Sequence, residues 1–356
     1  MSALPARVTE LTGRVTKLAG RRGGYLSAAA IGVVGAGVLA DRYVLRRVHR
    51  RAAEEAFGEL PASRTRSVRA SDGVELYVEE VGRIDAPLTV IFVHGFMLEL
   101  ASWHYQRLGL ASDDVRLVLY DQRCHGRSGC GDGEALSVSQ LGKDLVSVLD
   151  ACAPAGPVVL VGHSMGGIAV QALVEDRPDV LANRVAGVAL ISTSAGELEQ
   201  VTFGFPRTLV GPLRRVLPPI AQQVPALLEV ARRAGGGARV VLTQLYSFGS
   251  KVDPALVAFM DVMLSRVRID VVTAFWPLFL SHHKADSLPR LAAVPTVVIA
   301  GDTDRIIPSH HSQTIAALIP GATLTIVPQA GHMLILERPD LVTEIIGGLI
   351  ASARNT

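Results

Sequence analysis

The stretch Leu160-Val-Gly-His-Ser-Met-Gly-Gly-Ile168 decides the fold of this chain. Gly162 directly follows the apolar run 157–161, and Ser164 lies between Gly162 and Gly166. A buried strand that enters a tight turn and leaves as a helix has this pattern, because side chains at the glycines would collide with neighbouring backbone. The turn holds the serine hydroxyl in the open, beside the free N–H groups of the following helix. The sequence therefore predicts a nucleophilic serine at a strand–turn–helix junction.

Length and composition are those of an apolar globular protein. The chain has 356 residues, of which 49% are hydrophobic and 19% charged, enough for one large α/β domain with an insertion. The formal charge of +2 combines a net +8 in residues 1–70 with a net −6 in the remainder. Because the basic excess lies in the N-terminal arm, we expect no nucleic-acid partner.

The cysteines leave the redox compartment open. Cys124, Cys130 and Cys152 are too few and too oddly numbered for a disulfide framework, which favours a reducing compartment. A single bridge between Cys124 and Cys130 is compatible with the same sequence.

The N-terminal arm carries a candidate membrane segment. Residues 24–40 form a run of 17 uncharged residues, which would span roughly 25 Å as a helix. Arg21-Arg22 precedes it, and five arginines follow between positions 42 and 51. We expect an uncleaved membrane anchor, because these arginines resist translocation. A cleaved twin-arginine export signal and an Ala/Gly-rich helix of a cytoplasmic protein are the alternatives. Membrane orientation and oligomeric state are left open.

Strands and helices alternate beyond the arm. Continuous apolar runs such as Leu88–Val93 and Val115–Tyr120 are separated by amphipathic stretches such as Val138–Cys152. This alternation predicts an α/β fold with a mostly parallel, doubly wound sheet covered by helices on both faces. We divide the chain into a basic arm with a helical stalk over 1–61, a core over 62–194 and 288–356, and a helical insertion over 195–287.

Five motifs, in order along the chain, resemble those of the α/β-hydrolase superfamily. The resemblance covers roughly 63–194 and 291–352, with Cys124 where the family usually has glycine. The motifs are His94-Gly95-Phe96, Tyr120-Asp-Gln-Arg-Cys-His-Gly-Arg-Ser128, Gly162-His-Ser-Met-Gly-Gly167, Pro295-Thr-Val-Val-Ile-Ala-Gly-Asp-Thr-Asp-Arg-Ile-Ile-Pro308 and Gln329-Ala-Gly-His-Met333.

The resemblance implies a catalytic triad. A serine hydroxyl needs a base to take its proton, and His332, in a loop after the strand 322–327, is the candidate partner of Ser164. An imidazole needs an orienting carboxylate, and Asp302 and Asp304 both follow the strand 296–300. We choose Asp304, because the family's acid lies just before the element matched by 305–308, and keep Asp302 as the alternative.

An ester carbonyl gains negative charge on its oxygen during attack. We expect the backbone N–H groups of Phe96 and Met165 to meet this oxyanion. No cofactor is implied, and no metal is expected, because neither H-E-x-x-H nor paired C-x-x-C occurs in the sequence.

The insertion between 194 and 288 is where similar hydrolases carry a helical cap. Helices are expected over 206–216, 220–233, 254–267 and 271–280, and the glycine run 234–238 is expected to be an inter-helix loop. The following apolar residues are divided between the cap core and a substrate pocket: Phe203, Phe205, Leu242, Leu245, Phe259, Met260, Met263, Phe275, Trp276 and Phe279. A large apolar pocket favours a small lipophilic ester as substrate, hydrolysed by an esterase or monoacylglycerol-lipase-like enzyme.

Other functions are compatible with parts of this pattern. A serine at position 164 argues against the epoxide hydrolases and haloalkane dehalogenases of this fold, which use an aspartate nucleophile. A carbon–carbon bond hydrolase or a cofactor-free haloperoxidase or perhydrolase would keep the same triad. A non-catalytic binding module should show a broken triad, and the sequence shows an intact one.

Overall fold

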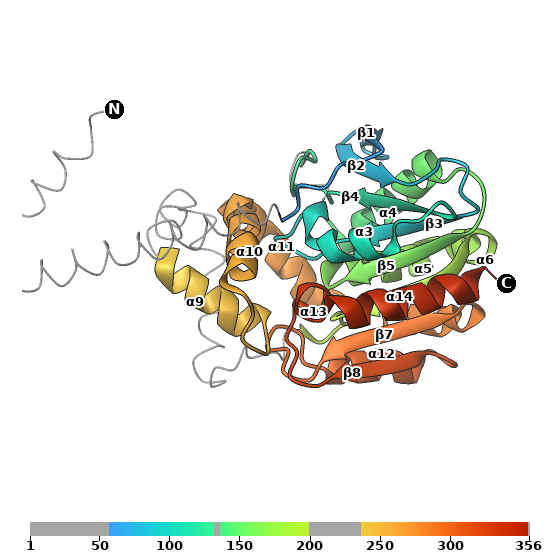
Figure 1. Ribbon diagram of the computed structural model, residues 1–356. Helices are drawn as coiled ribbons and strands as arrows, with labels where there is room; N and C mark the ends of the chain where they lie inside the picture. Colours follow the sequence, from blue (N-terminus) through green and yellow to red (C-terminus); the bar gives the residue numbers. More distant parts are fainter. Residues whose placement is uncertain (1–56, 132–135, 199–235, 355–356) are drawn as a thin grey trace, which may run out of the picture.

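The computed structural model describes residues 57–131, 136–198 and 236–354, and these form an eight-stranded sheet with helices on both faces (Figure 1). The strand order is β1-β2-β4-β3-β5-β6-β7-β8. β1 pairs antiparallel with β2, and β2 with β4, whereas all other neighbours are parallel. The mostly parallel sheet predicted from the sequence is therefore confirmed. The strands are β1 (Arg64–Arg69), β2 (Glu75–Val81), β3 (Leu88–Val93), β4 (Val115–Tyr120), β5 (Val158–His163), β6 (Val185–Ile191), β7 (Thr296–Gly301) and β8 (Thr323–Val327).

Two hydrophobic cores lie on opposite faces of the sheet. Ile91 and Val93 of β3 point into the core shared with α4, α5 and α12, whereas Val90 and Phe92 point into the core shared with α3 and α14. Strands buried on both faces explain the continuous apolar runs in the sequence. The helices of the core are η1 (Leu100–Trp103), α3 (His104–Leu110), α4 (Val138–Cys152), α5 (Met165–Asp176), α6 (Pro178–Arg184), η4 (Ala285–Ala293), α12 (His310–Leu318), α13 (Leu334–Glu337) and α14 (Pro339–Ala353).

Strand register brings distant loops to one edge of the sheet. Val93 at the end of β3 pairs with Gly162 of β5, and Gly301 at the end of β7 pairs with Val327 of β8. Because parallel strands end at the same edge, the loops after β3, β5, β7 and β8 all leave the sheet together. These loops hold Phe96, Ser164, Asp302, Asp304 and His332, and Met165 begins the helix that follows Ser164.

Three helices of the predicted insertion lie beyond this edge, between β6 and β7 in the chain (Figure 1). They are α9 (Gly236–Ser247), α10 (Pro254–Arg266) and α11 (Ile269–Ser281). The last two match the predicted helices, and the helices predicted over 206–216 and 220–233 lie outside the described residues. The loop predicted over 234–238 is wrong from Gly236 onward, because α9 begins there. Gly236 and Gly237 lie in the first turn of this helix, where backbone N–H groups have no intrahelical acceptors.

The arm is described only from Phe57. The helical stalk predicted at the end of the arm does not include Phe57 and Gly58, which form a turn in which Gly58 has a φ of 77°. The apolar segment 24–40 lies outside the described residues. Within the described part of the chain, no helix is long and apolar enough to cross a membrane.

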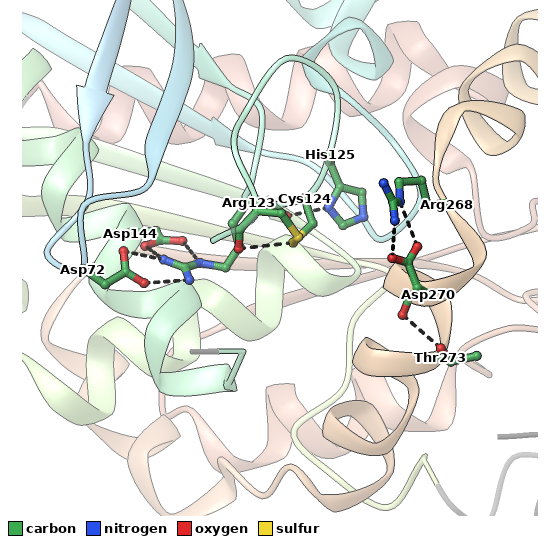
Figure 2. Close-up of a disulfide and its surroundings, with 9 residues drawn as sticks. Asp72, Arg123, Cys124, His125, Asp144, Arg268, Asp270 and Thr273 are labelled. Carbon is green, nitrogen blue, oxygen red and sulfur yellow. Dashed lines mark hydrogen bonds and ion pairs between the residues drawn. A yellow bond between two sulfur atoms is a disulfide. The ribbon is translucent and has the colours of Figure 1, made fainter. Parts of the chain in front are cut away.

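A disulfide joins Cys124 and Cys130 in the turn after β4 (Figure 2). Cys152 is buried in α4 as a free thiol. The bridge that the sequence left open is thus present, and the cysteine count no longer favours a reducing compartment.

A buried ion pair fixes the start of the same turn (Figure 2). The Arg123 side chain is fully buried, and its Nε and Nη2 donate to the two carboxylate oxygens of Asp144 at 2.5 and 2.7 Å. Its Nη1 donates to Asp72 at 2.9 Å. Burial raises the pKa of Asp144, whereas hydrogen bonding from Arg123 lowers the pKa of Asp72 at the surface. The pair connects the turn after β4 to α4 and to the β1–β2 hairpin.

Replacing Asp144 with alanine should destabilise the protein, because it leaves the buried Arg123 guanidinium without its main partner. We expect the free energy of unfolding in urea to fall by about 3 kcal/mol, the lower end for breaking a buried pair, since Asp72 remains. Asp85→Ala, which removes half of the exposed Arg83–Asp85 pair, is the matched control and should leave the urea midpoint unchanged. Equal midpoints for the two variants would contradict a structural role for this pair.

Candidate active site

Ser164 lies at the apex of the turn between β5 and α5. Its φ of 53° and ψ of −117° are rare for a non-glycine residue and cost free energy that the surrounding packing must offset. A Cβ at Gly166 would lie 2.0 Å from the carbonyl oxygen of Val93, and one at Gly162 would lie 2.6 Å from the carbonyl oxygen of Gly166. The glycines therefore allow the backbone reversal that presents the Ser164 hydroxyl.

Ser164, His332 and Asp304 form one chain of hydrogen bonds. The distance from Ser164 Oγ to His332 Nε2 is 3.1 Å, and that from His332 Nδ1 to Asp304 Oδ2 is 2.8 Å. All three side chains are buried. Because a carboxylate only accepts, Nδ1 carries the imidazole proton and the Nε2 lone pair faces the serine hydroxyl. The arrangement has the geometry of a nucleophile, its base and an orienting acid.

The two candidate acids lie in the loop after β7 and have different surroundings. Asp304 is buried, and its Oδ1 accepts from the backbone N–H groups of Ile306 and Ile307, each at 2.8 Å. Asp302 is exposed, and its backbone N–H donates to Val327 at 3.0 Å. The structure thus brings Asp304, and not Asp302, to His332.

The residues of the two predicted oxyanion donors line the same cavity as the serine. Met165 is the first residue of α5, so its N–H is one of the helix groups without an intrahelical acceptor. Phe96 lies in the loop after β3, and Phe96, Met165 and Ser164 all line one cavity. Two backbone donors beside a nucleophile are the groups that stabilise a tetrahedral oxyanion.

Two buried histidines hold the loop that carries Phe96. His94 Nε2 accepts from the backbone N–H of Gln122 at 2.9 Å, and His125 Nε2 accepts from that of Met97 at 3.1 Å. Burial lowers the pKa of His94 to about 3 and that of His125 to about 4. Both rings are therefore neutral at physiological pH and keep the lone pairs that these contacts need.

The loop of His332 is held from both sides. His163, next to the nucleophile, places its Nε2 3.0 Å from the carbonyl oxygen of His332. Burial lowers the pKa of His163 to about 3, so this ring is also neutral, with Nε2 as the donor. Adjacent to His332, the N–H of Met333 donates to the carbonyl of Ser247 at the end of α9, at 2.7 Å. The base is thus connected to both the nucleophile turn and the cap.

Glu337 also holds the loop of His332, a role that was not predicted from the sequence. Its Oε2 accepts from the backbone N–H groups of Gly331 at 2.7 Å and Gly249 at 3.0 Å. Its Oε1 accepts from the N–H and the hydroxyl of Ser250, each at 2.6 Å. A carboxylate directly after the apolar run 333–336 was the available signal, because a buried charge requires partners.

An apolar cavity of about 180 Å³ opens beside Ser164. Of the apolar residues expected to be divided between core and pocket, Trp276 and Phe279 line the cavity. Phe259, Met260, Met263 and Phe275 are buried in the hydrophobic cores. Leu242 and Leu245 are exposed on α9, and Phe203 and Phe205 lie outside the described residues. The cavity is lined by Phe96, Met97, Ser164, Met165, Ile168, Leu198, Leu264, Trp276, Phe279, Leu280, Ile306 and Ile307.

A larger cleft of about 570 Å³ contains none of the triad. Charged side chains line it, including Glu79, Glu99, Asp121, Arg127 and Arg266. The apolar cavity is therefore the candidate substrate site. Over the described ranges, no group of three His, Cys, Asp or Glu side chains lies close enough together to hold a metal ion.

Known proteins share this fold and parts of this sequence. A family model described as the alpha/beta hydrolase family matches residues 90–345. The bifunctional esterase/perhydrolase DCH of Acinetobacter calcoaceticus is 34% identical over 126 residues, which are 35% of this chain and 43% of that protein. The sn-1-specific diacylglycerol lipase ABHD11 of Mus musculus is 25% identical over 270 residues, 75% of this chain and 82% of that protein.

The similarity to a solved structure covers nearly the full length of that enzyme. A thermophilic esterase from Thermogutta terrifontis superposes with a TM-score of 0.65 at 25% identity, covering 82% of this chain and 99% of that one. The family match spans most of the sheet, the nucleophile turn and the loops of Asp304 and His332. The chain belongs to the alpha/beta hydrolase family.

Proposed function

We propose that this protein is a serine hydrolase that cleaves carboxylic esters with a lipophilic acyl group. The observation that carries the proposal is the hydrogen-bond chain from Asp304 through His332 to Ser164, which ends at an apolar cavity. A lone serine hydroxyl is a weak nucleophile, and this chain supplies the base and the orienting acid that it needs.

In the proposed mechanism, Ser164 Oγ attacks the ester carbonyl while His332 Nε2 takes the hydroxyl proton. The N–H groups of Phe96 and Met165 stabilise the oxyanion, and Asp304 stabilises the imidazolium. The intermediate collapses as His332 returns the proton to the leaving alcohol. Water, activated by His332, then hydrolyses the acyl-enzyme and releases the acid.

The cavity favours an apolar acyl group. Besides Ser164, every side chain that lines it is a hydrocarbon, aromatic or thioether group. Such a pocket gains free energy from each methylene removed from water. An esterase/perhydrolase, a diacylglycerol lipase and a solved esterase among the similar proteins support ester chemistry. We propose that residues 195–287 cap this pocket.

Carbon–carbon bond hydrolysis and perhydrolysis are alternative reactions on the same triad. The similarity to a bifunctional esterase/perhydrolase favours perhydrolysis as the second candidate. In that reaction hydrogen peroxide replaces water in attacking the acyl-enzyme and releases a peracid. A non-catalytic binding module is disfavoured by the triad geometry.

We also propose that the segment 24–40 associates with a membrane. Its length and lack of charge support insertion, and the five arginines that follow support contact with anionic headgroups. A lipophilic substrate dissolved in the same membrane would then be close to the enzyme.

Ser164→Ala should abolish turnover of p-nitrophenyl butyrate and labelling by a fluorophosphonate probe, because both need the serine oxygen. Asp304→Asn should lower kcat by about 10⁴-fold by favouring the wrong imidazole tautomer. Asp302→Asn, a matched change two residues away, should retain nearly full kcat. Undiminished labelling of Ser164→Ala, or a larger loss at Asp302, would sink the assignment.

Acyl-chain preference tests the substrate class. We expect kcat/KM for p-nitrophenyl esters to rise about fourfold per methylene until the cavity is filled, given about 0.8 kcal/mol per buried methylene. Leu280→Trp should narrow the cavity and shift the preference to acetate, whereas Leu108→Trp on the surface should not. A flat chain-length profile, with faster turnover of a meta-cleavage product or faster peracid formation, would favour the alternative reactions.

Membrane attachment through 24–40 is tested by an alkaline carbonate wash of cell membranes. The full-length chain should stay with the membrane fraction, because apolar insertion survives high pH. A chain that begins at Ser63 should move to the soluble fraction. Recovery of the full-length chain in the soluble fraction rules out an integral anchor.

A further inference from the structure

The disulfide between Cys124 and Cys130 closes the turn that follows β4 (Figure 2). The backbone of Cys124 has a φ of 65°, in the left-handed region that disfavours most side chains. Its N–H donates to the carbonyl of Gly129 at 2.9 Å, and the N–H of His125 donates to that of Gln122 at 3.0 Å. Both cysteines are half-buried, so a small reductant has access to them from solvent.

This turn is held at both of its ends. Before Cys124, the Arg123 side chain is bound by Asp144 and Asp72 (Figure 2). After it, the chain returns to Cys124 through the disulfide with Cys130. His125 lies between these two restraints. Its position therefore depends on a buried ion pair and on a covalent bond.

His125 connects this turn to the loop that carries an oxyanion donor. Its Nδ1 lies 2.8 Å from the carbonyl oxygen of Arg123, and its Nε2 accepts from the N–H of Met97 at 3.1 Å. Met97 follows Phe96, whose N–H is the proposed second donor. Met97 has a φ of 60°, so this part of the loop needs outside support to keep its conformation.

The His125 ring also packs against Phe96, which lines the cavity, and against the buried Phe275 of α11. Its centroid lies 5.5 Å from that of Phe96 and 5.5 Å from that of Phe275 in α11. These edge-to-face contacts fix the ring plane and hence the direction of the Nε2 lone pair. Movement of His125 would thus shift Phe96 relative to the cap.

We propose that His125 is a positioning residue for the oxyanion loop, and that the Cys124–Cys130 disulfide keeps it in place, so that reduction of the disulfide slows ester hydrolysis without unfolding the protein. The inference rests on the proposed serine-hydrolase function. In the redox step a dithiol supplies two electrons and two protons. The S–S bond breaks, both cysteines become thiols, and the dithiol is oxidised to its cyclic disulfide.

Reduction removes the covalent restraint on a backbone that is unfavourable for Cys124. Without it, Cys124 is free to relax toward negative φ and to carry His125 away from the N–H of Met97. Glycine has no such preference. A chain with glycine at position 124 should therefore keep the turn without the bridge.

The test compares oxidised and dithiothreitol-treated protein on p-nitrophenyl butyrate. We expect reduction to lower kcat about tenfold with KM nearly unchanged, less than the roughly 10²–10³-fold cost of deleting an oxyanion donor. The Ki of a trifluoromethyl ketone, whose serine adduct carries an oxyanion, should rise by the same factor. The far-ultraviolet circular dichroism spectrum should not change.

Matched variants separate the bridge from other effects of the reductant. Cys124→Ala with Cys130→Ala should have the activity of the reduced protein and no longer respond to dithiothreitol. Cys124→Gly with Cys130→Ser should recover most of the oxidised activity and also be insensitive. Cys152→Ser removes the free thiol of α4 and should respond as the natural chain does.

Substitution of His125 tests the positioning contact directly. His125→Leu removes the acceptor for Met97 and should lower kcat and weaken trifluoromethyl ketone binding, again with little change in KM. His125→Gln places an amide oxygen near the former Nε2 and should restore most of the loss. A purely structural role would lower the melting temperature of both variants without this rescue.

The outcomes are distinguishable from failure of the proposed function. If the oxidised protein does not react with a fluorophosphonate, the serine-hydrolase proposal fails. If it reacts, and reduction or His125→Leu leaves kcat and the trifluoromethyl ketone Ki unchanged, the positioning proposal is overturned.

Discussion

The close approach of α5 to the end of β3 is the constraint on which the site depends. A Cβ on Gly166 would overlap the Val93 carbonyl, so only glycine lets the two backbones meet. This approach puts the first turn of α5, with the N–H of Met165, beside the loop that carries Phe96. The strained backbone of Ser164 follows from the same reversal. The positions of Ser164 and of the Met165 N–H, the proposed nucleophile and one proposed oxyanion donor, thus both depend on one packing contact.

Neutral histidines join the loops at the carboxyl ends of the strands. His94 and His125 accept from backbone N–H groups, whereas His163 contacts the carbonyl of His332. An imidazole offers one donor and one acceptor in a rigid ring, which suits it to link two loops. Burial favours the uncharged form in all three. Of these four histidines, His332 alone faces both Ser164 and Asp304 and is placed to move a proton.

The number of positions that separate two interacting residues in the sequence explains which parts of the site the sequence predicted. Ser164 and His332 lie in local motifs at the ends of strands, and the choice of Asp304 came from its position in one loop. Glu337 contacts residues 88 positions away, and Arg123 pairs with Asp144 across 21 positions. Hydrophobic periodicity carries no information about such pairs. The number of cysteines favoured free thiols, and the bridge between Cys124 and Cys130 was only compatible with it, because a cysteine count carries no information about which side chains meet.

Phe96 couples chemistry to substrate selection. Its backbone N–H is the proposed oxyanion donor, while its ring contacts Phe279 of α11 at a centroid distance of 5.0 Å and lines the cavity. A substrate that fills the cavity presses on the ring whose backbone must stay fixed during attack. Because a hydrogen bond weakens steeply with misalignment, a poorly fitting acyl group loses oxyanion stabilisation as well as hydrophobic contact. We therefore expect fit in the pocket to change kcat and not only KM in the proposed reaction.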